Sequence, residues 1–442
     1  MVDHAHSSDP AVQRQLDRLT ALSPGADILG LERITALLAR VGDPHLNLPP
    51  VLHVAGTNGK GSTCAFLRAA IEAAGLRAHV YSSPHLVRFN ERIRLAGHLI
   101  EDAALAPLLE EVLDGGGDIG ASFFEVTTAA AFLAFARTPA DACVIEVGLG
   151  GRLDATNVVH PVATGIAQLG IDHQSFLGDR LVEIAGEKAG IAKPGVPLVT
   201  MRYAEDVAVK VAQVAAQAGA PLLTEGDAWR WSADSGRLHY SDARGEIETP
   251  LPGLAGPHQP ANLALAIALL RAQTALTIPD SAYAAAAINA RWPARMQRLS
   301  PGPLTAILPD DVAIWLDGGH NPAAATAVAE TLRRVAPEGA RHLILGMLAN
   351  KEPEGLLAPL VPLLDSVTAV PIPGHEHHAP ADLAAVAQRL GIRSAMTAAD
   401  IPEALGWVRR RIDPRGEAPA VLILGSLYLA GTVLEMNEEL PV

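Results

Sequence analysis

Residues 54–63 combine glycines, a lysine and hydroxyl side chains in an order that suits phosphate binding. An apolar run precedes this segment and a helical pattern follows it, which predicts a strand, a turn and a helix. Glycines let backbone N–H groups converge on an anion, and the start of the helix adds a partial positive charge. Lys60 can reach the terminal phosphates, while Ser62 or Thr63 offers a hydroxyl to Mg²⁺. Gly61 separates Lys60 from Ser62, unlike the ordinary P-loop, and a chance glycine-rich turn is the alternative on this segment alone.

A second segment, residues 141–157, places a carboxylate at the end of an apolar strand. Glu146 ends this strand, and a glycine-rich stretch with the polar turn 154–157 follows it. A carboxylate is costly at this place unless a cation or hydrogen bonds compensate it, and ligands bind at this end of the strands in an α/β sheet. His173 and Lys188 follow two further apolar stretches. We therefore expect an imidazole and a lysine near the same edge of the sheet.

The composition is that of a large globular protein. The 442 residues are 49% hydrophobic and 19% charged, which is enough to build more than one core. The formal net charge of −14 argues against general affinity for nucleic acid or anionic membranes, because both favour basic surfaces. An anionic substrate then needs a locally basic pocket. The basic side chains next to a motif are His85, Arg88, Arg92 and Arg94, for which a solvated strand face is the alternative.

Several features indicate a location in the cytoplasm. Cys64 and Cys143 are the only cysteines and give no disulfide framework. The first ten residues lack the basic and apolar regions of a secretory signal, and no apolar run reaches transmembrane length. We expect a cytoplasmic protein without a membrane partner.

Apolar runs of strand length alternate with alanine-rich helical stretches, which is typical of a doubly wound α/β fold. Residues 225–250 differ, because aromatic residues separated by Ser, Asp and Gly indicate a small antiparallel excursion. Residues 292–303 have the Pro and Gly content of a linker, after which the alternation restarts as a second α/β domain. The predicted strands are 51–54, 78–81, 142–147, 163–169, 197–200, 312–316, 343–345, 366–370 and 421–424.

The motifs, in this order, resemble those of the folylpolyglutamate synthase and dihydrofolate synthase family, relatives of the Mur ligases. They extend over nearly the whole chain, so the resemblance is far more specific than one glycine motif. The blocks that carry it are residues 56–62, 81–86, 88–92, 146–157, 172–173, 187–191, 258–259 with Asn262, and 317–322.

The resemblance implies an α/β fold with two domains. Residues 1–295 would form a P-loop domain of the Mur ligase type with a mostly parallel sheet. Residues 296–442 would form a smaller Rossmann-like domain for glutamate ligation. The implied reaction is ATP-dependent: a carboxylate of dihydropteroate or of a folate glutamate tail attacks the γ-phosphate, and the α-amine of L-glutamate then attacks the acyl phosphate. We expect a monomer.

The resemblance also implies the residues that handle ATP and metal. Lys60, Lys188, His320 and Asp154 would be catalytic. Two Mg²⁺ sites are expected, with K⁺ as an open addition, and Lys188 lies where the family carries a carbamylated lysine. The implied metal ligands are Ser62, Ser83, Glu146, His173 and Lys188. The implied ATP contacts are Thr57, Asn58, Gly59, Lys60, Gly61, Ser62, Asn262, Arg295, Asp317 and His320.

Each implied ligand also has a structural alternative from the residues alone. Ser83 before a proline fits a turn, Glu146 can pair with Arg152, and His173 can be a hydrogen-bonded structural histidine. Lys188 can be a surface lysine that pairs with a neighbouring glutamate.

The acceptor end of the site is implied in the same way. Residues 29–33 match the family's N-terminal substrate loop, and aromatic stacking on a pterin is plausible, although a Phe pair at a helix start more often packs in a core. The implied substrate contacts are Ser122, Phe123, Phe124, Glu125, Leu153, Asp154, Ala155 and Arg92.

Three alternatives stay open or are set aside. A synthase with polyglutamylation activity only would share all these motifs. A Mur-type ligase would need an additional N-terminal domain for its uridine nucleotide, and little chain precedes the phosphate loop. A non-catalytic P-loop regulator would not need Glu146, His173 and Lys188 together. We do not expect a metal at the histidine-rich residues 375–378, because no distal ligand signature accompanies them.

Overall fold

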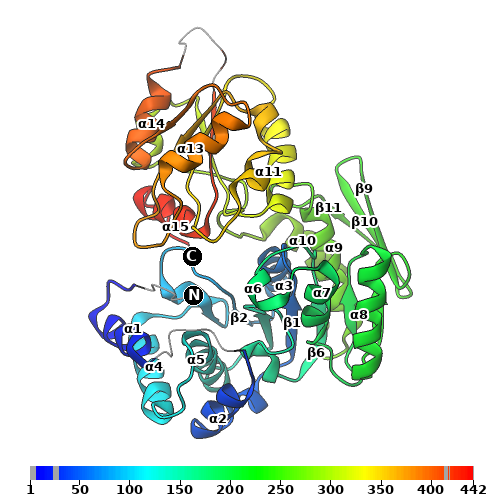
Figure 1. Cartoon of the computed structure of the whole chain (residues 1–442). Helices are drawn as coiled ribbons and strands as arrows, with labels where there is room; N and C mark the ends of the chain where they lie inside the picture. Colours follow the sequence, from blue (N-terminus) through cyan, green and yellow to red (C-terminus); the bar gives the residue numbers. More distant parts are fainter. Residues whose placement is uncertain (1–5, 23–28, 413–416, 418, 442) are drawn as a thin grey trace. The chain divides into compact units, whose positions relative to one another are not determined.

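The computed structural model describes residues 6–22, 29–412, 417 and 419–441, and Figure 1 shows the course of the chain. Residues 1–5, at the start of the segment in which no secretory signal is predicted, lie outside the described residues. The chain divides into two compact units. The first contains Met1–Gly253 and Gln259–Arg291, and the second contains Leu254–His258 and Trp292–Val442. Within the described ranges, every helix is too short or too polar to span a lipid bilayer.

A largely parallel sheet organises the first unit. Its eight strands, counted over the described residues, lie in the order β4-β3-β2-β5-β1-β6-β7-β8. Strands β2, β5, β1, β6, β7 and β8 are mutually parallel, and β3 and β4 are antiparallel additions at the β2 edge. The bounds are β1 Val51–Ala55, β2 Ala78–Tyr81, β3 Ile93–Leu95, β4 His98–Leu99, β5 Ala142–Glu146, β6 Pro161–Ile166, β7 Leu198–Thr200 and β8 Leu222–Thr224.

Helices cover both faces of this sheet, as a parallel sheet requires. On one face, helix α3 contacts β1, β2 and β5, and α9 contacts β6 and β7. The other face carries two apolar cores, one formed with α1, α2, α4 and α5 and the other with α7 and α8. The helix bounds are α1 Pro10–Leu22, α2 Glu32–Arg40, α3 Lys60–Ala73, α4 Asp102–Gly116, α5 Phe123–Arg137, α6 Gln174–Leu177, α7 Leu181–Ala189, α8 Glu205–Ala218, α9 Gln259–Ala272 and α10 Asp280–Asn289. Three short 3₁₀ helices of this unit are η1 Pro44–Asn47, η2 Phe89–Arg92 and η3 Ala155–Val158.

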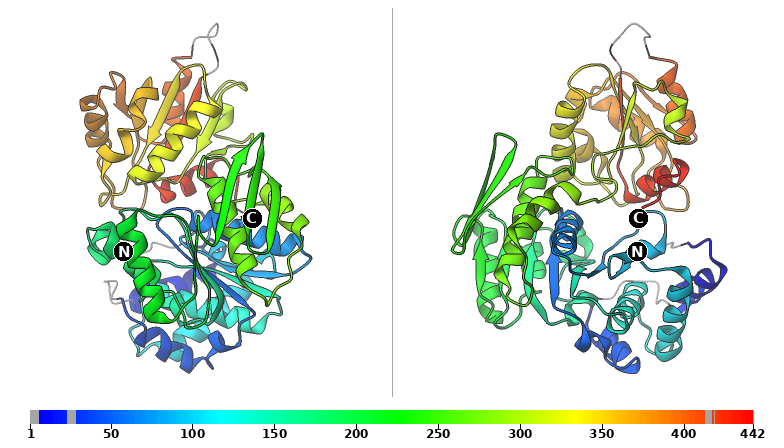
Figure 2. Two further views of the ribbon diagram at one scale, coloured as in Figure 1. Left: turned by 90° about the vertical axis from the view of Figure 1, so that its right-hand side faces the viewer. Right: turned by 180° about the vertical axis from the view of Figure 1, so that it is seen from behind.

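A small antiparallel sheet, predicted from residues 225–250, is confirmed. It consists of β9 (Trp229–Asp234), β10 (Arg237–Asp242) and β11 (Gly245–Pro250), and Figure 2 shows it at the periphery of the first unit. Its buried Trp229 and Tyr240 stack with ring centroids 6.0 Å apart. Arg271 of α9 donates to both carboxylate oxygens of Asp242, which ties the sheet to the helix behind it.

The second unit is a smaller α/β body. Its sheet has the order β12-β13-β17-β14-β15-β16, and its strands are parallel except for β12. The strand bounds are β12 Gln297–Arg298, β13 Ala313–Leu316, β14 Arg341–Leu345, β15 Ser366–Ala369, β16 Ala395–Thr397 and β17 Ala420–Leu424. The helix bounds are α11 Pro322–Val335, α12 Pro353–Leu357, α13 Pro380–Arg389, α14 Ile401–Arg409 and α15 Leu427–Met436, with 3₁₀ helices η4 Thr305–Ile307 and η5 Val361–Leu363.

The predicted α/β class with a mostly parallel first sheet is therefore confirmed. One predicted strand, 163–169, is displaced along the sequence, because β6 begins at Pro161 and ends at Ile166. Beyond it, the Gln168 carbonyl turns away from the sheet ladder and accepts hydrogen bonds from Thr57 and Asn58. The apolar character of this segment thus continues past the strand into a loop that supports the phosphate-binding turn.

The ion pair between Arg271 and Asp242 gives a stability prediction. Both side chains are largely buried, at 8% and 12% exposure, so Arg271→Met leaves a carboxylate without its cation and should lower the free energy of unfolding by about 2 kcal/mol. Urea denaturation followed by circular dichroism measures the change. Arg237→Met is the matched control, since Arg237 pairs with Glu248 on the same sheet and both side chains are about half exposed. An equal loss for the two variants would contradict this assignment.

Candidate functional site

The phosphate-binding turn joins β1 to α3 and is held by backbone contacts from the segment after β6. The N–H groups of Thr57 and Asn58 donate to the Gln168 carbonyl at 2.8 and 3.1 Å. The Thr57 hydroxyl donates to the Gly170 carbonyl at 3.0 Å and accepts from the Gly170 N–H at 3.1 Å. Helix α3 begins at Lys60, and within the described residues no side chain caps its start. The N–H groups of its first turn are therefore oriented to receive an anion.

Gly59 is where this turn needs glycine. Its φ is +86°, and a Cβ at this position would lie 2.5 Å from Asn262 Oδ1. Asn262 and Gln259 belong to the first turn of α9 and are buried, and Gln259 donates to the Ser62 hydroxyl at 3.2 Å. Asn262 in turn donates to Gln259 Oε1 at 3.1 Å. The starts of α3 and α9 thus form one polar cradle, in which Asn262 lies against the loop.

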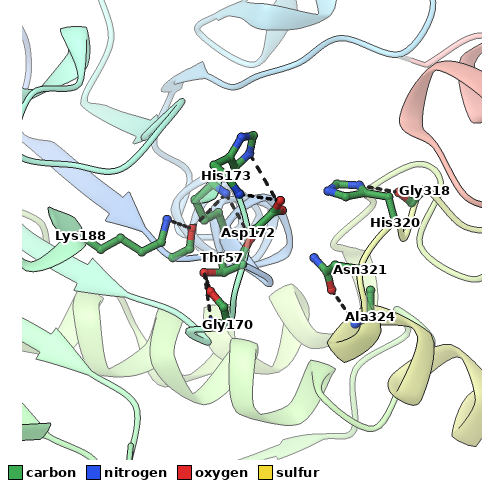
Figure 3. A network of polar contacts seen from close by, with 11 residues as sticks. Thr57, Gly170, Asp172, His173, Lys188, Gly318, His320, Asn321 and Ala324 are labelled. Carbon is green, nitrogen blue, oxygen red and sulfur yellow. Dashed lines mark hydrogen bonds and ion pairs between the residues drawn. The ribbon is translucent and has the colours of Figure 1, made fainter. Parts of the chain in front are cut away.

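Two lysines converge on a single carbonyl of this loop. Lys60 Nζ lies 3.1 Å from the Gly56 oxygen, and Lys188 Nζ lies 3.0 Å from the same oxygen. Figure 3 shows the Lys188 amine directed to this loop. Lys188 is 4% exposed, and burial together with the Lys60 charge lowers the pKa of its amine to about 7. The surface position considered for Lys188 is therefore wrong.

The carboxyl ends of four adjacent strands carry the predicted metal ligands. Ser83 follows β2, Glu146 ends β5, Ser62 follows the loop after β1, and His173 lies beyond β6. The register pairs Val54 of β1 with Glu146, so the carboxylate lies beside the start of the phosphate loop. Glu146 is 5% exposed. Arg152, which was considered as its partner, forms an ion pair with Glu187 at 2.9 Å.

His173 has a left-handed backbone, with φ of +52°. Its backbone N–H donates to Asp172 Oδ1 at 2.9 Å, a contact that Figure 3 includes. Within the described residues, no three His, Cys, Asp or Glu side chains are grouped as a metal site. The donors near the loop are instead a mixed set of hydroxyl, carboxylate and imidazole groups. Oxygen and nitrogen donors of this kind fit Mg²⁺ or Mn²⁺, and the buried Thr63 Oγ1, which has no hydrogen bond among the described residues, is a further oxygen at the start of α3.

A second group of predicted residues surrounds the loop after β5. The Phe124 ring lies so close to Gly148 that a Cβ on Gly148 would be 2.3 Å from the ring. Asp154 is 2% exposed, and its carboxylate accepts hydrogen bonds from the Leu149 N–H at 2.7 Å, the Thr156 N–H at 3.0 Å and the Thr156 hydroxyl. Burial raises the pKa of Asp154, and these hydrogen bonds act in the opposite direction. Its neighbours Leu153 and Ala155 are half-buried and buried.

The start of α5 contributes the other residues of this group. Ser122 and Glu125 form a capping box, in which Glu125 Oε2 accepts from the Ser122 N–H at 2.7 Å. Arg33 donates to the same oxygen at 3.0 Å. The second oxygen, Oε1, is buried and has no hydrogen-bond partner among the described residues. Glu125 therefore retains an acceptor next to Phe124 that a ligand could use.

Arg92 is almost fully buried, at 2% exposure. Its Nε donates to His85 Nδ1 at 2.9 Å, and its guanidinium lies 5.6 and 5.4 Å from the ring centroids of Phe89 and Phe123. Phe123 thus packs against Arg92 in the core cluster, while Phe124 is half-buried. Arg94 donates to the Gly97 carbonyl instead, so the basic residues of this segment do not form one surface.

In the second unit, Asp317 organises two segments at once. It is buried, its Oδ2 accepts from the Met296 N–H at 2.8 Å, and its Oδ1 accepts from the Gly319 N–H at 2.7 Å. Arg295 lies between Ala294 and Met296, which have positive φ angles of +53° and +41°. This strained pair was not foreseen, because neither residue type indicates a left-handed backbone. Asp317 therefore holds the backbone that carries Arg295.

His320 and Asn321 follow at the start of α11. His320 Nδ1 lies 3.3 Å from the Gly318 carbonyl, and Asn321 Oδ1 accepts from the Ala324 N–H at 2.9 Å, as Figure 3 also shows. Elsewhere in this unit, the ring of His375 stacks on Tyr428 with centroids 3.9 Å apart. His377 and His378 hydrogen-bond to the carbonyls of His375 and Lys351. The histidine-rich segment is thus engaged in packing and backbone contacts.

Comparisons with known proteins give one consistent result. A model of the family described as dihydrofolate synthetase, C-terminal domain, matches residues 304–436. The dihydrofolate synthase/folylpolyglutamate synthase of Escherichia coli is 33% identical over 411 residues, which cover 92% of this chain and 91% of that protein.

Solved structures are similar over nearly the whole length. The structure of E. coli FolC in complex with DHPP and ADP has a TM-score of 0.87 at 31% identity and covers 98% of both chains. A crystal structure of bifunctional folylpolyglutamate synthase/dihydrofolate synthase with Mn, AMPPNP and L-glutamate bound has a TM-score of 0.84 at 32% identity, and covers 97% of this chain and 99% of that one.

The cradle of Gly59 and Asn262 gives a second stability prediction. Gly59→Ala should lower the free energy of unfolding by about 2 to 3 kcal/mol, because it adds a clash to the cost of a left-handed alanine. Gly75→Ala is the control, at a glycine that follows the C-terminal end of α3. Its φ is +80°, and apart from its two chain neighbours no heavy atom of the described residues lies within 4 Å of where a Cβ would be. That variant should lose only about 1 kcal/mol. Equal losses in urea denaturation would mean that Asn262 does not constrain the loop.

Proposed function

The chain belongs to the folylpolyglutamate synthase and dihydrofolate synthase family, and we propose that it is an ATP-dependent ligase that joins L-glutamate to dihydropteroate and to the γ-carboxylate of folates. The observation that carries the proposal is the arrangement of Lys60, Glu146 and Lys188 around one phosphate-binding turn. A carboxylate is activated here by phosphoryl transfer, which needs charge neutralisation and alignment rather than a protein nucleophile.

The chain's own residues divide this work. The first-turn N–H groups of α3 hold the phosphates, with Thr57, Asn58, Gly59 and Gly61 shaping the loop. Lys60 exchanges its contact with the Gly56 carbonyl for the transferred phosphate, whose negative charge is the stronger acceptor. After phosphoryl transfer, the α-amine of glutamate attacks the acyl carbon and phosphate leaves.

The metal sites follow from the donors at the strand ends. Mg²⁺, when bound, neutralises charge on the phosphate oxygens. Ser62, Ser83, Glu146 and His173 would hold it, as the Mn-containing relative also suggests for the family. Lys188 would hold a second ion as a carbamate. Burial and the nearby Lys60 charge disfavour its ammonium form, and reaction of the neutral amine with CO₂ would give an anion that Lys60 attracts. K⁺ is proposed as an additional monovalent ion.

The acceptor would bind beside the loop after β5, which contains Asp154 and lies against Phe124. A flat pterin would stack on Phe124, while Asp154 and Glu125 accept hydrogen bonds from its ring N–H groups. Ser122, Phe123, Leu153, Ala155 and Arg92 shape this region, the first through the cap of α5 and the last from the core below it. The E. coli FolC complex with DHPP and ADP supports a pteridine-type ligand for this family.

The other proposed nucleotide contacts belong to the second unit. Arg295 and His320 would bind phosphate, with Asn262 from the first unit beside the loop, and Asp317 would contribute through ribose contact and through the Arg295 backbone. By the boundary that the sequence predicts, residues 1–295 would serve as the ATP-binding domain and residues 296–442 as the glutamate ligase domain, although the compact units divide before Trp292. We propose a monomer that works in the cytoplasm.

The proposal is tested by phosphate release with ATP, glutamate and an acceptor. Release should require both dihydropteroate and glutamate, and tetrahydrofolate should replace dihydropteroate as acceptor. Lys60→Ala should lower turnover about a thousandfold, because a positioned charge over the transferred phosphate is lost, while circular dichroism stays unchanged. Turnover with tetrahydrofolate alone would reduce the protein to polyglutamylation, and near wild-type turnover by the folded variant would refute the phosphate-loop assignment.

The role of Lys188 is tested separately. Lys188→Ala should lower turnover about a hundredfold through the lost metal-binding carboxylate, and excess acetate should restore part of the rate. Labelling with ¹³C-bicarbonate should give a carbamate signal in wild type that is absent from this variant. Lys210→Ala is the control, because Lys210 lies on α8 beside Gly186 rather than at the loop. An unlabelled wild type with an active Lys188→Ala variant would show that the position is structural.

A further inference from the structure

A chain of polar side chains leads from the interior of the first sheet to Asp154. His53 lies in the middle of β1, is 0% exposed, and its Nε2 is 2.9 Å from the Thr156 hydroxyl oxygen. The Thr156 hydroxyl is in turn hydrogen-bonded to Asp154 Oδ1. His53 shares a sheet face with Val51 and Ala55, both of which belong to apolar cores. Burial of an imidazole among apolar side chains costs free energy unless a hydrogen bond compensates it, and the bond to Thr156 does so.

The direction of the hydrogen bonds follows from the acceptor at the end. A carboxylate only accepts, so the Thr156 hydroxyl must donate its one proton to Asp154. The Thr156 oxygen then receives the proton on His53 Nε2, which fixes the imidazole in the Nε2–H form. Nδ1 of His53 is buried and has no hydrogen-bond partner among the described residues, consistent with a nitrogen that carries no proton. Burial also lowers the pKa of His53 to about 3, so the ring stays neutral.

The hydrogen bonds from His53 to Thr156 and from Thr156 to Asp154 determine how the Asp154 carboxylate is oriented. Oδ1 receives the Thr156 N–H and hydroxyl, and Oδ2 receives the Leu149 N–H at 2.7 Å. Without His53, the Thr156 hydroxyl could rotate away from Asp154, and one of the donors that fix the carboxylate would be lost. A ligand hydrogen bond to a loosely held carboxylate is weaker, because the ligand must then order the group on binding.

We propose that His53 is a positioning residue for the acceptor substrate, acting through Thr156 on Asp154. The inference rests on the proposed function, in which Asp154 binds the pterin ring. His53 touches no substrate in this account. It determines how tightly the acceptor is bound, and it does not alter the handling of ATP.

The first experiment compares three variants by steady-state kinetics. His53→Leu should raise KM for dihydropteroate about tenfold, with KM for ATP and kcat changed less than about twofold, because a buried hydrogen bond to the acceptor's partner is lost. His53→Gln should restore most of the affinity, since its Nε2 can donate near the same place. Thr156→Val should reproduce the effect of His53→Leu, and Thr156→Ser should retain wild-type values.

His79→Leu is the matched control. His79 is a second buried histidine of the same sheet, on β2, and it bonds to the Thr138 carbonyl and the Ala96 N–H. Its loss should cost stability and leave KM for dihydropteroate unchanged. If His53→Leu and His79→Leu behave alike, His53 is merely structural and the proposal is overturned. Absence of dihydropteroate ligation in wild type would instead refute the proposed function, which keeps the two failures apart.

A second measurement reads the tautomer of His53 in the unmodified protein, and variants serve only to assign the signal. In ¹⁵N-histidine NMR spectra, His53 should show a protonated Nε2 and a bare Nδ1 at neutral pH. The signal is assigned by its loss in His53→Gln, or by elimination with His79→Leu. A protonated Nδ1 on His53 would mean that the Thr156 hydroxyl donates to His53 Nε2 and not to Asp154. His53 would then not position Asp154, and the proposal would be overturned.

Discussion

The parallel pairing of β1 with β5 and β6 is the constraint on which the first unit depends. Parallel strands bring their carboxyl ends to one edge, and the chain crosses from β5 over β1 to β6, so that the loops after these strands meet at this edge. The register sets Val54 opposite Glu146, and the Gln168 carbonyl beyond β6 accepts two N–H groups of the phosphate loop. A one-residue slip would move each functional side chain to the other face.

This edge brings several charged side chains close together. Lys60 and Lys188 share the Gly56 oxygen, and Glu146 lies one strand away in a nearly buried position. Burial lowers the pKa of the Lys188 amine, and the charge of the neighbouring Lys60 ammonium lowers it further. In the proposed function, an anionic phosphate would draw Lys60 away from the carbonyl and relieve this crowding of positive charge.

Sequence patterns predicted the parts of the fold that depend on long apolar periodicity. The α/β class, the central strands and the antiparallel sheet at 225–250 follow from them and are confirmed. Short strands such as β3 and β4 were not predicted, because two or three residues carry too little pattern. The left-handed Ala294 and Met296 were also missed, because their residue types give no signal; in the fold, the nearby Gln297 side chain accepts from the Ala294 N–H and the more distant Asp317 accepts from the Met296 N–H.

The candidate site was predictable in its residue types but not in its supports. Glycine, lysine and carboxylate at strand ends have recognisable spacing, and the resemblance to a family placed the others. Gln168 supports the loop through its backbone carbonyl, which any residue could supply, so the sequence offers no signal for it. His53 sits inside an apolar strand, where a lone histidine is most simply taken as a core residue. Its partner Thr156 lies about a hundred positions away, and only the fold brings them together.

Both units use a buried carboxylate in the same physical way. Asp154 and Asp317 each accept backbone N–H groups from a neighbouring turn, and burial raises the pKa of both. A carboxylate oxygen has two lone pairs, so a group that already fixes a turn can still accept from a ligand. Holding the turn removes the entropy that a ligand would otherwise have to pay on binding. In the proposed function, the two carboxylates would therefore couple loop geometry to ligand contact, and a neutral amide would supply one acceptor oxygen where each turn uses two.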